Sequence, residues 1–201
     1  MMVKGITDED FVNYKVPSMF IATAKCSFKC DNEYGSPVCQ NSNLAKQPNI
    51  WIDNDQIVER FLNNKISKAI VFGGLEPAEQ LDDIIDIIYK LRYSFMGYDY
   101  YQGLPSDPHP KSVSDVVIYT GYNKDEFRDI FWHTHAMHHA YEPWLWLEFR
   151  TQELSKSIED EVFQDGLVIK YGRYIPGQQP HLDPVLGVYL ASDNQYAERI
   201  S

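Results

Sequence analysis

The stretch from Ala69 to Gly74 reads Ala-Ile-Val-Phe-Gly-Gly. Four apolar residues closed by two glycines are typical of a strand that is buried on both faces in a parallel sheet. Pro77 follows, and apolar residues then recur at helical spacing, at Leu81, Ile84, Ile85, Ile88 and Leu91. A strand, a glycine turn and a helix make one βα unit, which predicts a parallel sheet of the α/β class.

The same alternation extends to both sides of this unit. Further strands are expected over Met19–Thr23, Val116–Tyr119 and Gly166–Tyr171. Further helices are expected after the capping residues Asp53 to Asp55, and over Lys124–Phe131. The carboxyl ends of parallel strands lie on one edge of the sheet, so the residues that follow each strand are expected to meet there.

The two ends of the chain are less regular. Met1–Lys15 is polar, and its expected anchors in the core are Phe11, Val12 and Tyr14. Gly172 is expected to turn the strand that precedes it into a partner strand over Arg173–Ile175, and a last strand is expected over Val185–Leu190.

Composition and charge limit the class of protein. At 201 residues, with 44% hydrophobic and 23% charged residues, the chain fits one globular domain over residues 1–201. The stretches 93–112 and 132–163 interrupt the βα pattern and are expected to be insertions in that domain. A formal net charge of −11 argues against a general nucleic-acid binder, because phosphate binding needs clustered Lys and Arg. No apolar run is long enough for a membrane span, and the polar N-terminus has no signal region, so a cytoplasmic protein is expected.

All three cysteines lie between Cys26 and Cys39, on the loop that follows the first of these strands. Core packing or a disulfide is one interpretation, although the neighbouring residues are polar and disulfides are rare inside cells. A structural zinc site is a second, and it requires a fourth ligand from a distant histidine. An iron–sulfur cluster is the third, in which three thiolates leave one iron open for a ligand.

Two other strand ends carry residues suited to a ligand. One is Gly73-Gly74-Leu75-Glu76-Pro77 and the other is Thr120-Gly121-Tyr122. Glycines allow close approach of the backbone to a ligand. Glu76 can accept a hydrogen bond from a ligand ammonium, and Thr120 offers a hydroxyl. In a parallel sheet these residues and the cysteine loop would converge on one site.

A group of four histidines, His133, His135, His138 and His139, lies in the second insertion. His135 and His139 would share one face of a helix with Glu142, a spacing that can bind zinc. Because that ligand set is incomplete, a solvated or aromatic-packed helix is the favoured interpretation.

In this order, the motifs resemble those of the radical S-adenosylmethionine superfamily, and within it those of the activating proteins of anaerobic ribonucleotide reductases. The matching features are a strand that leads into Cys26-x3-Cys30, the strand ends Val71–Pro77 and Val117–Tyr122, and the C-terminal segments Tyr171–Ile175 and Ser192–Gln195. The resemblance spans about Met19 to Ile200.

The resemblance implies an open partial (β/α) barrel of parallel strands with the site at their carboxyl ends. It implies that a 4Fe–4S cluster is held by Cys26, Cys30 and Cys39. The open iron would bind the amino and carboxylate groups of S-adenosylmethionine. The residues that hold this cofactor would be Gly73, Gly74 and Glu76, with Thr120 and Gly121 nearby.

The resemblance also implies an activity. An electron from the cluster would cleave the sulfonium and release a 5′-deoxyadenosyl radical, which abstracts hydrogen. The protein would then be an activase, and its partner a glycyl-radical reductase that gives up a hydrogen from a backbone glycine. The electron donor would be a flavodoxin or a ferredoxin.

The cysteine spacing departs from the family pattern. Two residues usually separate the second and third cysteines, whereas eight residues, Asp31 to Val38, do so here. The inserted residues include Tyr34, Gly35 and Pro37, so they can turn and return Cys39 to the other thiols. Two alternatives stay open: a radical enzyme acting on another peptide or a small molecule, and a non-catalytic iron–sulfur or zinc module that docks a partner.

Overall fold

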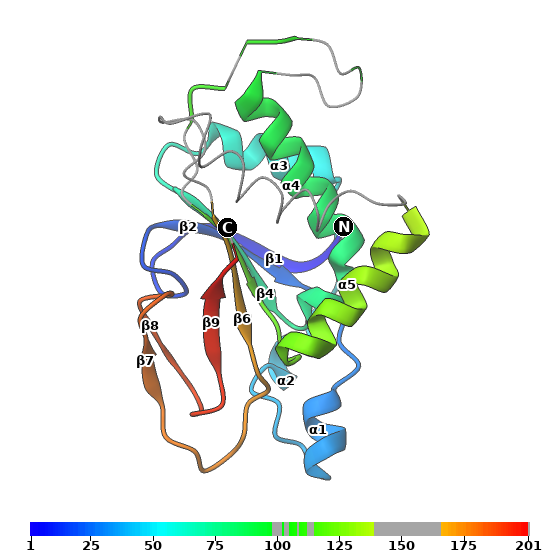
Figure 1. Cartoon of the computed structure of the whole chain (residues 1–201), viewed down its shortest axis with the longest axis vertical. Coiled ribbons are helices and arrows are strands. Elements are labelled where there is room, and N and C mark those ends of the chain that lie inside the picture. The colour runs from blue at the N-terminus through cyan, green and yellow to red at the C-terminus, as the bar shows by residue number, and fades with distance from the viewer. Residues whose placement is uncertain (98–101, 103–104, 108, 112–114, 139–165, 201) are drawn as a thin grey trace.

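The computed structural model describes residues 1–97, 102, 105–107, 109–111, 115–138 and 166–200 (Figure 1). The strands are β1 (Met2–Asp10), β2 (Ser18–Thr23), β3 (Ile50–Trp51), β4 (Ala69–Gly74), β5 (Asp115–Tyr119), β6 (Gly166–Tyr171), β7 (His181–Asp183), β8 (Val188–Leu190) and β9 (Tyr196–Arg199). The helices are α1 (Lys29–Tyr34), α2 (Ser42–Ala45), α3 (Asn54–Asn63), the 3₁₀ helix η1 (Pro77–Gln80), α4 (Leu81–Met96) and α5 (Lys124–His138).

Seven strands form one mixed sheet in the order β3-β1-β2-β4-β5-β6-β9, and β7 pairs with β8 as a hairpin. Strands β2, β4, β5 and β6 run parallel to one another, which confirms the parallel core predicted from the sequence. Antiparallel pairs flank this core, β1 with β2 and β3 on one side and β9 with β6 on the other. Among the described residues the pairing ends at β3 and β9. The open partial barrel remains a prediction.

The predicted partner of β6 is wrong. Residues Arg173–Ile175 form no strand, and β9 pairs with β6 instead. Gly172, at a φ of 96°, directs the chain out of the sheet. A β-carbon on this glycine would lie 2.8 Å from the carbonyl oxygen of Asn194, so the return of the chain beside it depends on glycine.

The polar start of the chain is the nine-residue strand β1, which the sequence did not predict. Its pairing with β2 and β3 comes from the backbone, so the polar side chains do not prevent it. Of the expected anchors, Tyr14 is buried as predicted. Phe11 and Val12 are 65% and 75% exposed, so those two predictions are wrong.

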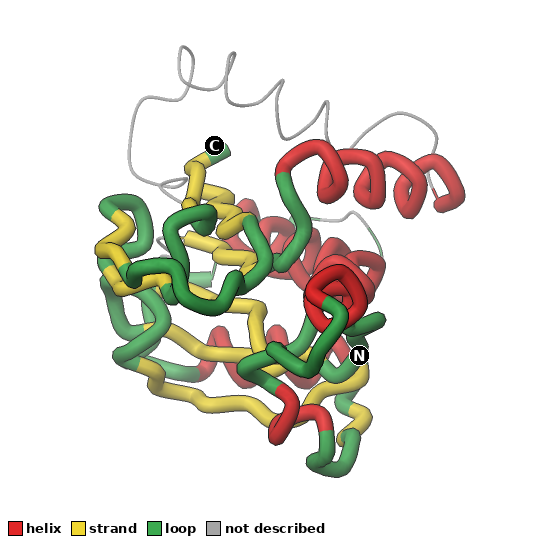
Figure 2. The backbone as a smooth tube through the Cα atoms, turned by 90° about the horizontal axis from the view of Figure 1, so that it is seen from below, coloured by secondary structure: helices red, strands yellow, loops and turns green. Residues whose placement is uncertain are grey.

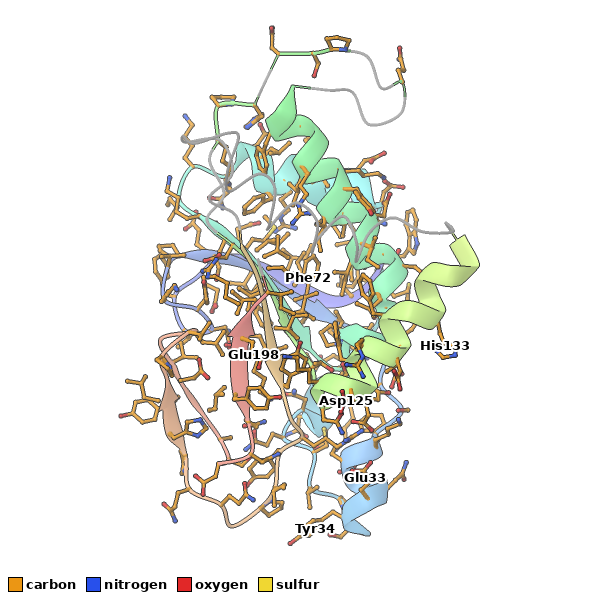
Figure 3. All side chains as sticks on the ribbon, viewed as in Figure 1. Glu33, Tyr34, Phe72, Asp125, His133 and Glu198 are labelled. Atoms are coloured by element: carbon orange, nitrogen blue, oxygen red, sulfur yellow. The ribbon has the colours of Figure 1, made fainter. Side chains whose placement is uncertain are left out.

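Both faces of the sheet are covered. On one face Ile70, Phe72 and Ile118 share a core with residues of α3, α4 and α5. Phe72 lies in the middle of this core (Figure 3). On the other face Val71 and Val117 share a second core with residues around the β7–β8 hairpin. Consecutive residues of a strand point to opposite faces, so one apolar run supplies both cores.

Helices α3, α4 and α5 are those that the sequence predicted, whereas α1 and α2 were not predicted. The Asp53 carboxylate accepts a hydrogen bond from the Asp55 amide at 2.9 Å and caps α3. Helix α4 follows η1 and carries the apolar stripe expected after Pro77. Helix α5 extends to His138, beyond the predicted end at Phe131. Within the described residues, no helix combines the length and the apolar character that crossing a membrane requires.

Candidate functional site

A cavity of about 400 Å³ lies at the carboxyl ends of the parallel strands. Helices α1 and α2 stand at this end of the sheet, which is the lower end in Figure 1 and faces the viewer in Figure 2. All eight residues that the sequence singled out line this cavity: Cys26, Cys30, Cys39, Gly73, Gly74, Glu76, Thr120 and Gly121. The expected convergence of the strand ends is therefore present.

The start of the cysteine loop is fixed to the segment that follows β4. The Gln80 side-chain oxygen accepts hydrogen bonds from the amides of Ala24 and Lys25, at 2.8 and 3.0 Å. The Glu76 amide donates to the Lys25 carbonyl at 2.8 Å, and the Glu79 carboxylate accepts from the Ser27 amide at 2.7 Å. These bonds hold the residues on both sides of Cys26 against η1.

The three thiols are free and partly buried. Burial raises the pKa of Cys26 to about 11, and the negative charges of Glu76 and Glu79 add to the shift. Burial, together with interaction with the Cys39 thiol, raises the pKa of Cys30 to about 12. A cation among these thiols would favour their thiolate forms.

The loop between Cys26 and Cys30 contains a strained residue. Phe28 has a φ of 53°, in the left-handed region that non-glycine residues seldom occupy. Its amide donates to the Cys26 sulfur at 3.2 Å, and its carbonyl accepts from the amides of Asp31 and Asn32. The backbone of Phe28 therefore joins the first cysteine to the start of α1.

Glu76 is buried and joins the ends of β4 and β5. Its carboxylate accepts hydrogen bonds from the Thr120 hydroxyl at 2.7 Å, the Gly121 amide at 2.8 Å and the Ala78 amide at 3.0 Å. Burial raises the pKa of Glu76, while these three donors lower it. A carboxylate has about four acceptor positions, so a ligand ammonium has room for about one more bond to it.

The two glycines of β4 serve the close packing of the strand end. Gly74 has a φ of 84°, and a β-carbon on it would lie 2.8 Å from the Cα of Ala22. Its carbonyl accepts a hydrogen bond from the Asn41 side chain, which fixes the far end of the cysteine loop. The Gly73 carbonyl accepts from the Thr23 hydroxyl at 2.9 Å.

Lys170 lines the same cavity, and the sequence analysis missed it. It is 7% exposed, and its ammonium donates to the Gly172 carbonyl at 2.8 Å. Burial lowers the pKa of Lys170 to about 8, against the opposing effect of the Glu76 charge. A single lysine within the apolar strand β6 was the available signal, because charged residues are seldom fully buried without a function or a partner.

Arg173 also lines the cavity and connects three segments around it. Its guanidinium forms two hydrogen bonds of 3.0 Å with Glu126 of α5, and its Nε lies 3.4 Å from the Glu33 carboxylate of α1. The guanidinium carbon of Arg173 also lies 5.2 Å from the centre of the Tyr122 ring. The ammonium of Lys29, on α1, lies 4.5 Å from the centre of the same ring. Helix α1 is thereby held against the rim.

The histidine site is described only in part. His133 lies on α5 and is exposed, and its Nδ1 lies 2.8 Å from the Asp129 carbonyl oxygen, to which it donates in the tautomer that carries the proton there. Figure 3 shows it on the side of α5 that faces away from the sheet. His135 and His138 belong to the same helix, whereas His139 and Glu142 lie outside the described residues. A zinc site there remains a prediction.

The thiols of the cavity suit a soft metal, because thiolates favour iron–sulfur clusters and zinc over hard cations. In the described part of the chain, no three side chains of the His, Cys, Asp and Glu types are arranged as a metal site. A metal held by all three cysteines would therefore require their thiols to come closer together than they lie here. The residue types fit a cluster, and the loop that carries them would have to adjust.

Comparison with known proteins gives no relative: no family model matches the chain, and no curated protein and no solved structure matches it.

Replacement of Glu76 by Gln tests the burial of this carboxylate. The folded protein binds the Glu76 proton more tightly than the unfolded chain, in which the pKa of this carboxyl group is near 4.5. The free energy of unfolding of the wild type should therefore fall, relative to that of Glu76→Gln, as the pH rises above 4.5. Urea denaturation of both proteins at pH 5 and pH 7 measures this difference.

Glu59→Gln, which removes an exposed carboxylate from α3, is the matched control. A free energy of unfolding of the wild type that stays constant or rises with pH, relative to that of Glu76→Gln, would contradict the raised pKa.

Proposed function

We propose that this protein is a radical S-adenosylmethionine enzyme whose cysteine loop holds a 4Fe–4S cluster. One observation carries the proposal. Three free thiols, a buried carboxylate and a buried lysine line a single cavity at the carboxyl ends of parallel strands. This edge is where α/β folds place their ligands.

The charges in the cavity complement an amino acid group. Glu76 offers a buried carboxylate, which favours a ligand ammonium. Lys170 offers a buried ammonium, which favours a ligand carboxylate. A ligand that brings both groups would place each opposite its counter-charge, out of water, where such pairs interact strongly. The methionine part of S-adenosylmethionine has this pair of groups.

In the proposed enzyme Cys26, Cys30 and Cys39 hold the cluster, which would supply the electron for cleavage of the sulfonium. The chain itself binds and orients. Glu76 with Gly73 and Gly74 receives the ligand ammonium, and the hydrogen bonds from Thr120 and Gly121 keep the Glu76 carboxylate in place.

The rest of the cavity would receive the substrate. The lining of the cavity also includes Phe20, Tyr119, Tyr174 and Tyr189, and Tyr189 is 74% exposed. An aromatic wall and an exposed tyrosine suit an uncharged peptide segment from a partner protein. We propose a glycyl-radical reductase as this partner, with a flavodoxin or ferredoxin as the electron donor.

The cysteine assignment is tested by replacing each thiol in turn. Cys26→Ala, Cys30→Ala and Cys39→Ala should each lose most of their iron after anaerobic reconstitution with iron and sulfide, whereas the wild type should reach about four irons per chain. Iron and sulfide analysis with the visible absorption spectrum measures this.

Ser36→Ala, on the same loop and exposed, is the control. A cysteine variant that keeps the full cluster would remove that cysteine from the ligand set. A wild type that binds one zinc ion tightly and takes up no iron would overturn the proposal.

The role of Lys170 is tested by Lys170→Met, which keeps an unbranched side chain but removes the charge. We expect the affinity of the reconstituted protein for S-adenosylmethionine to fall about 10- to 100-fold, the usual effect of losing a charged hydrogen bond. The iron content should not change. Anaerobic calorimetric titration measures the affinity.

Lys124→Met is the matched control, because Lys124 is exposed and pairs with Glu198 outside the cavity. Equal affinities of Lys170→Met and the wild type would show that Lys170 does not meet the ligand carboxylate.

A further inference from the structure

The second and third cysteines, Cys30 and Cys39, are widely spaced in the sequence. Eight residues separate Cys30 from Cys39. In an extended chain each residue adds about 3.3 Å, so the two thiols would lie far apart unless the inserted residues fold back. A ligand set that includes both cysteines requires a specific contact that closes this segment.

The first half of the closure is a helical turn. Residues Lys29–Tyr34 form α1, and the Gly35 amide donates to the Asp31 carbonyl at 2.9 Å. Gly35 has a φ of 73°, the left-handed conformation with which glycine commonly ends a helix. This turn reverses the chain after Tyr34 but does not by itself place Cys39.

The second half is made by one side chain. The Oδ1 atom of Asp31 accepts hydrogen bonds from the Val38 amide at 2.8 Å and from the Cys39 amide at 2.7 Å. The Cys30 thiol lies 3.8 Å from the same oxygen. One carboxylate oxygen therefore contacts the residue next to it in the chain and the cysteine eight positions further on.

We propose that Asp31 is the positioning residue of the third cysteine: its carboxylate holds the backbone of Cys39 beside Cys30, so that the long spacing can still serve one ligand set. The significance of this contact for a cluster rests on the proposed function, whereas the contact itself does not.

Other side chains of the loop form contacts that do not join Cys30 to Cys39. Glu33, which Figure 3 labels on α1, has its carboxylate 3.4 Å from Nε of Arg173. Asn41 fixes the segment after Cys39 to β4. Among the salt bridges of the described residues, none includes Asp31, so its hydrogen bonds with the two amides are its principal contacts.

The experiment measures the proximity of the two thiols in the metal-free protein. In a Cys26→Ser background only Cys30 and Cys39 remain. Dibromobimane, a short reagent that becomes fluorescent once it has joined two thiols, reports how readily they meet. Four proteins are compared, all reduced and under anaerobic conditions. They are the Cys26→Ser background with Asp31 intact, and the same background carrying Asp31→Ala, Asp31→Asn or the control Glu33→Ala.

We expect the rate of fluorescence gain to fall about tenfold in Asp31→Ala, because both amides lose their acceptor. Asp31→Asn should restore most of the rate, since an amide oxygen can accept the same two bonds. Glu33→Ala should match the background. Circular dichroism confirms that each variant is folded.

Equal rates in Asp31→Ala and the background would overturn the proposal. So would an equal loss in Asp31→Asn and Asp31→Ala, because a positioning role needs only an acceptor and no charge. If the expected pattern appears but the wild type takes up no iron, the role of Asp31 stands and the proposed function fails.

Discussion

The buried Glu76 carboxylate is the interaction on which the site depends. It receives a hydroxyl and an amide from the end of β5 and an amide from the start of η1, so two neighbouring strand ends and the entry to α4 meet at one group. A buried carboxylate is costly unless it is hydrogen-bonded, and here three donors offset that cost. The same carboxyl group lines the cavity.

The cysteine loop is organised around this centre. Residues of η1 hold its beginning, Asp31 closes its middle and Asn41 ties its end to Gly74. The contacts of Arg173 with Glu33 and of Lys29 with the Tyr122 ring hold α1 in place. Lys170 lines the same cavity and adds a buried ammonium, whose pKa the Glu76 charge raises against the effect of burial. The loop that carries the thiols is thus fixed by contacts at several points and is not a free connection between two elements.

Much of this arrangement was predictable because it follows from local pattern. The apolar run at Ala69–Gly74 and the stripe after Pro77 determine a βα unit, and parallel pairing then brings the strand ends together. Strand β1 escaped prediction because its pairing depends on the backbone, and β9 because a glycine at Gly172 was interpreted as a hairpin turn. Lys170 was visible as a charge within an apolar strand. The contact of Asp31 with Cys39 could not be predicted, since it joins residues through a fold of the loop that no periodicity encodes.

The central claim is that the cavity holds a cluster with an iron open to S-adenosylmethionine. Electron paramagnetic resonance of the anaerobically reconstituted and reduced protein, recorded with and without S-adenosylmethionine, tests it most directly. The account predicts a four-iron signal whose g-values shift when S-adenosylmethionine is added, because the ligand binds the iron that the three cysteines leave open. A four-iron signal that is identical with and without S-adenosylmethionine, or no cluster signal at all, would contradict it.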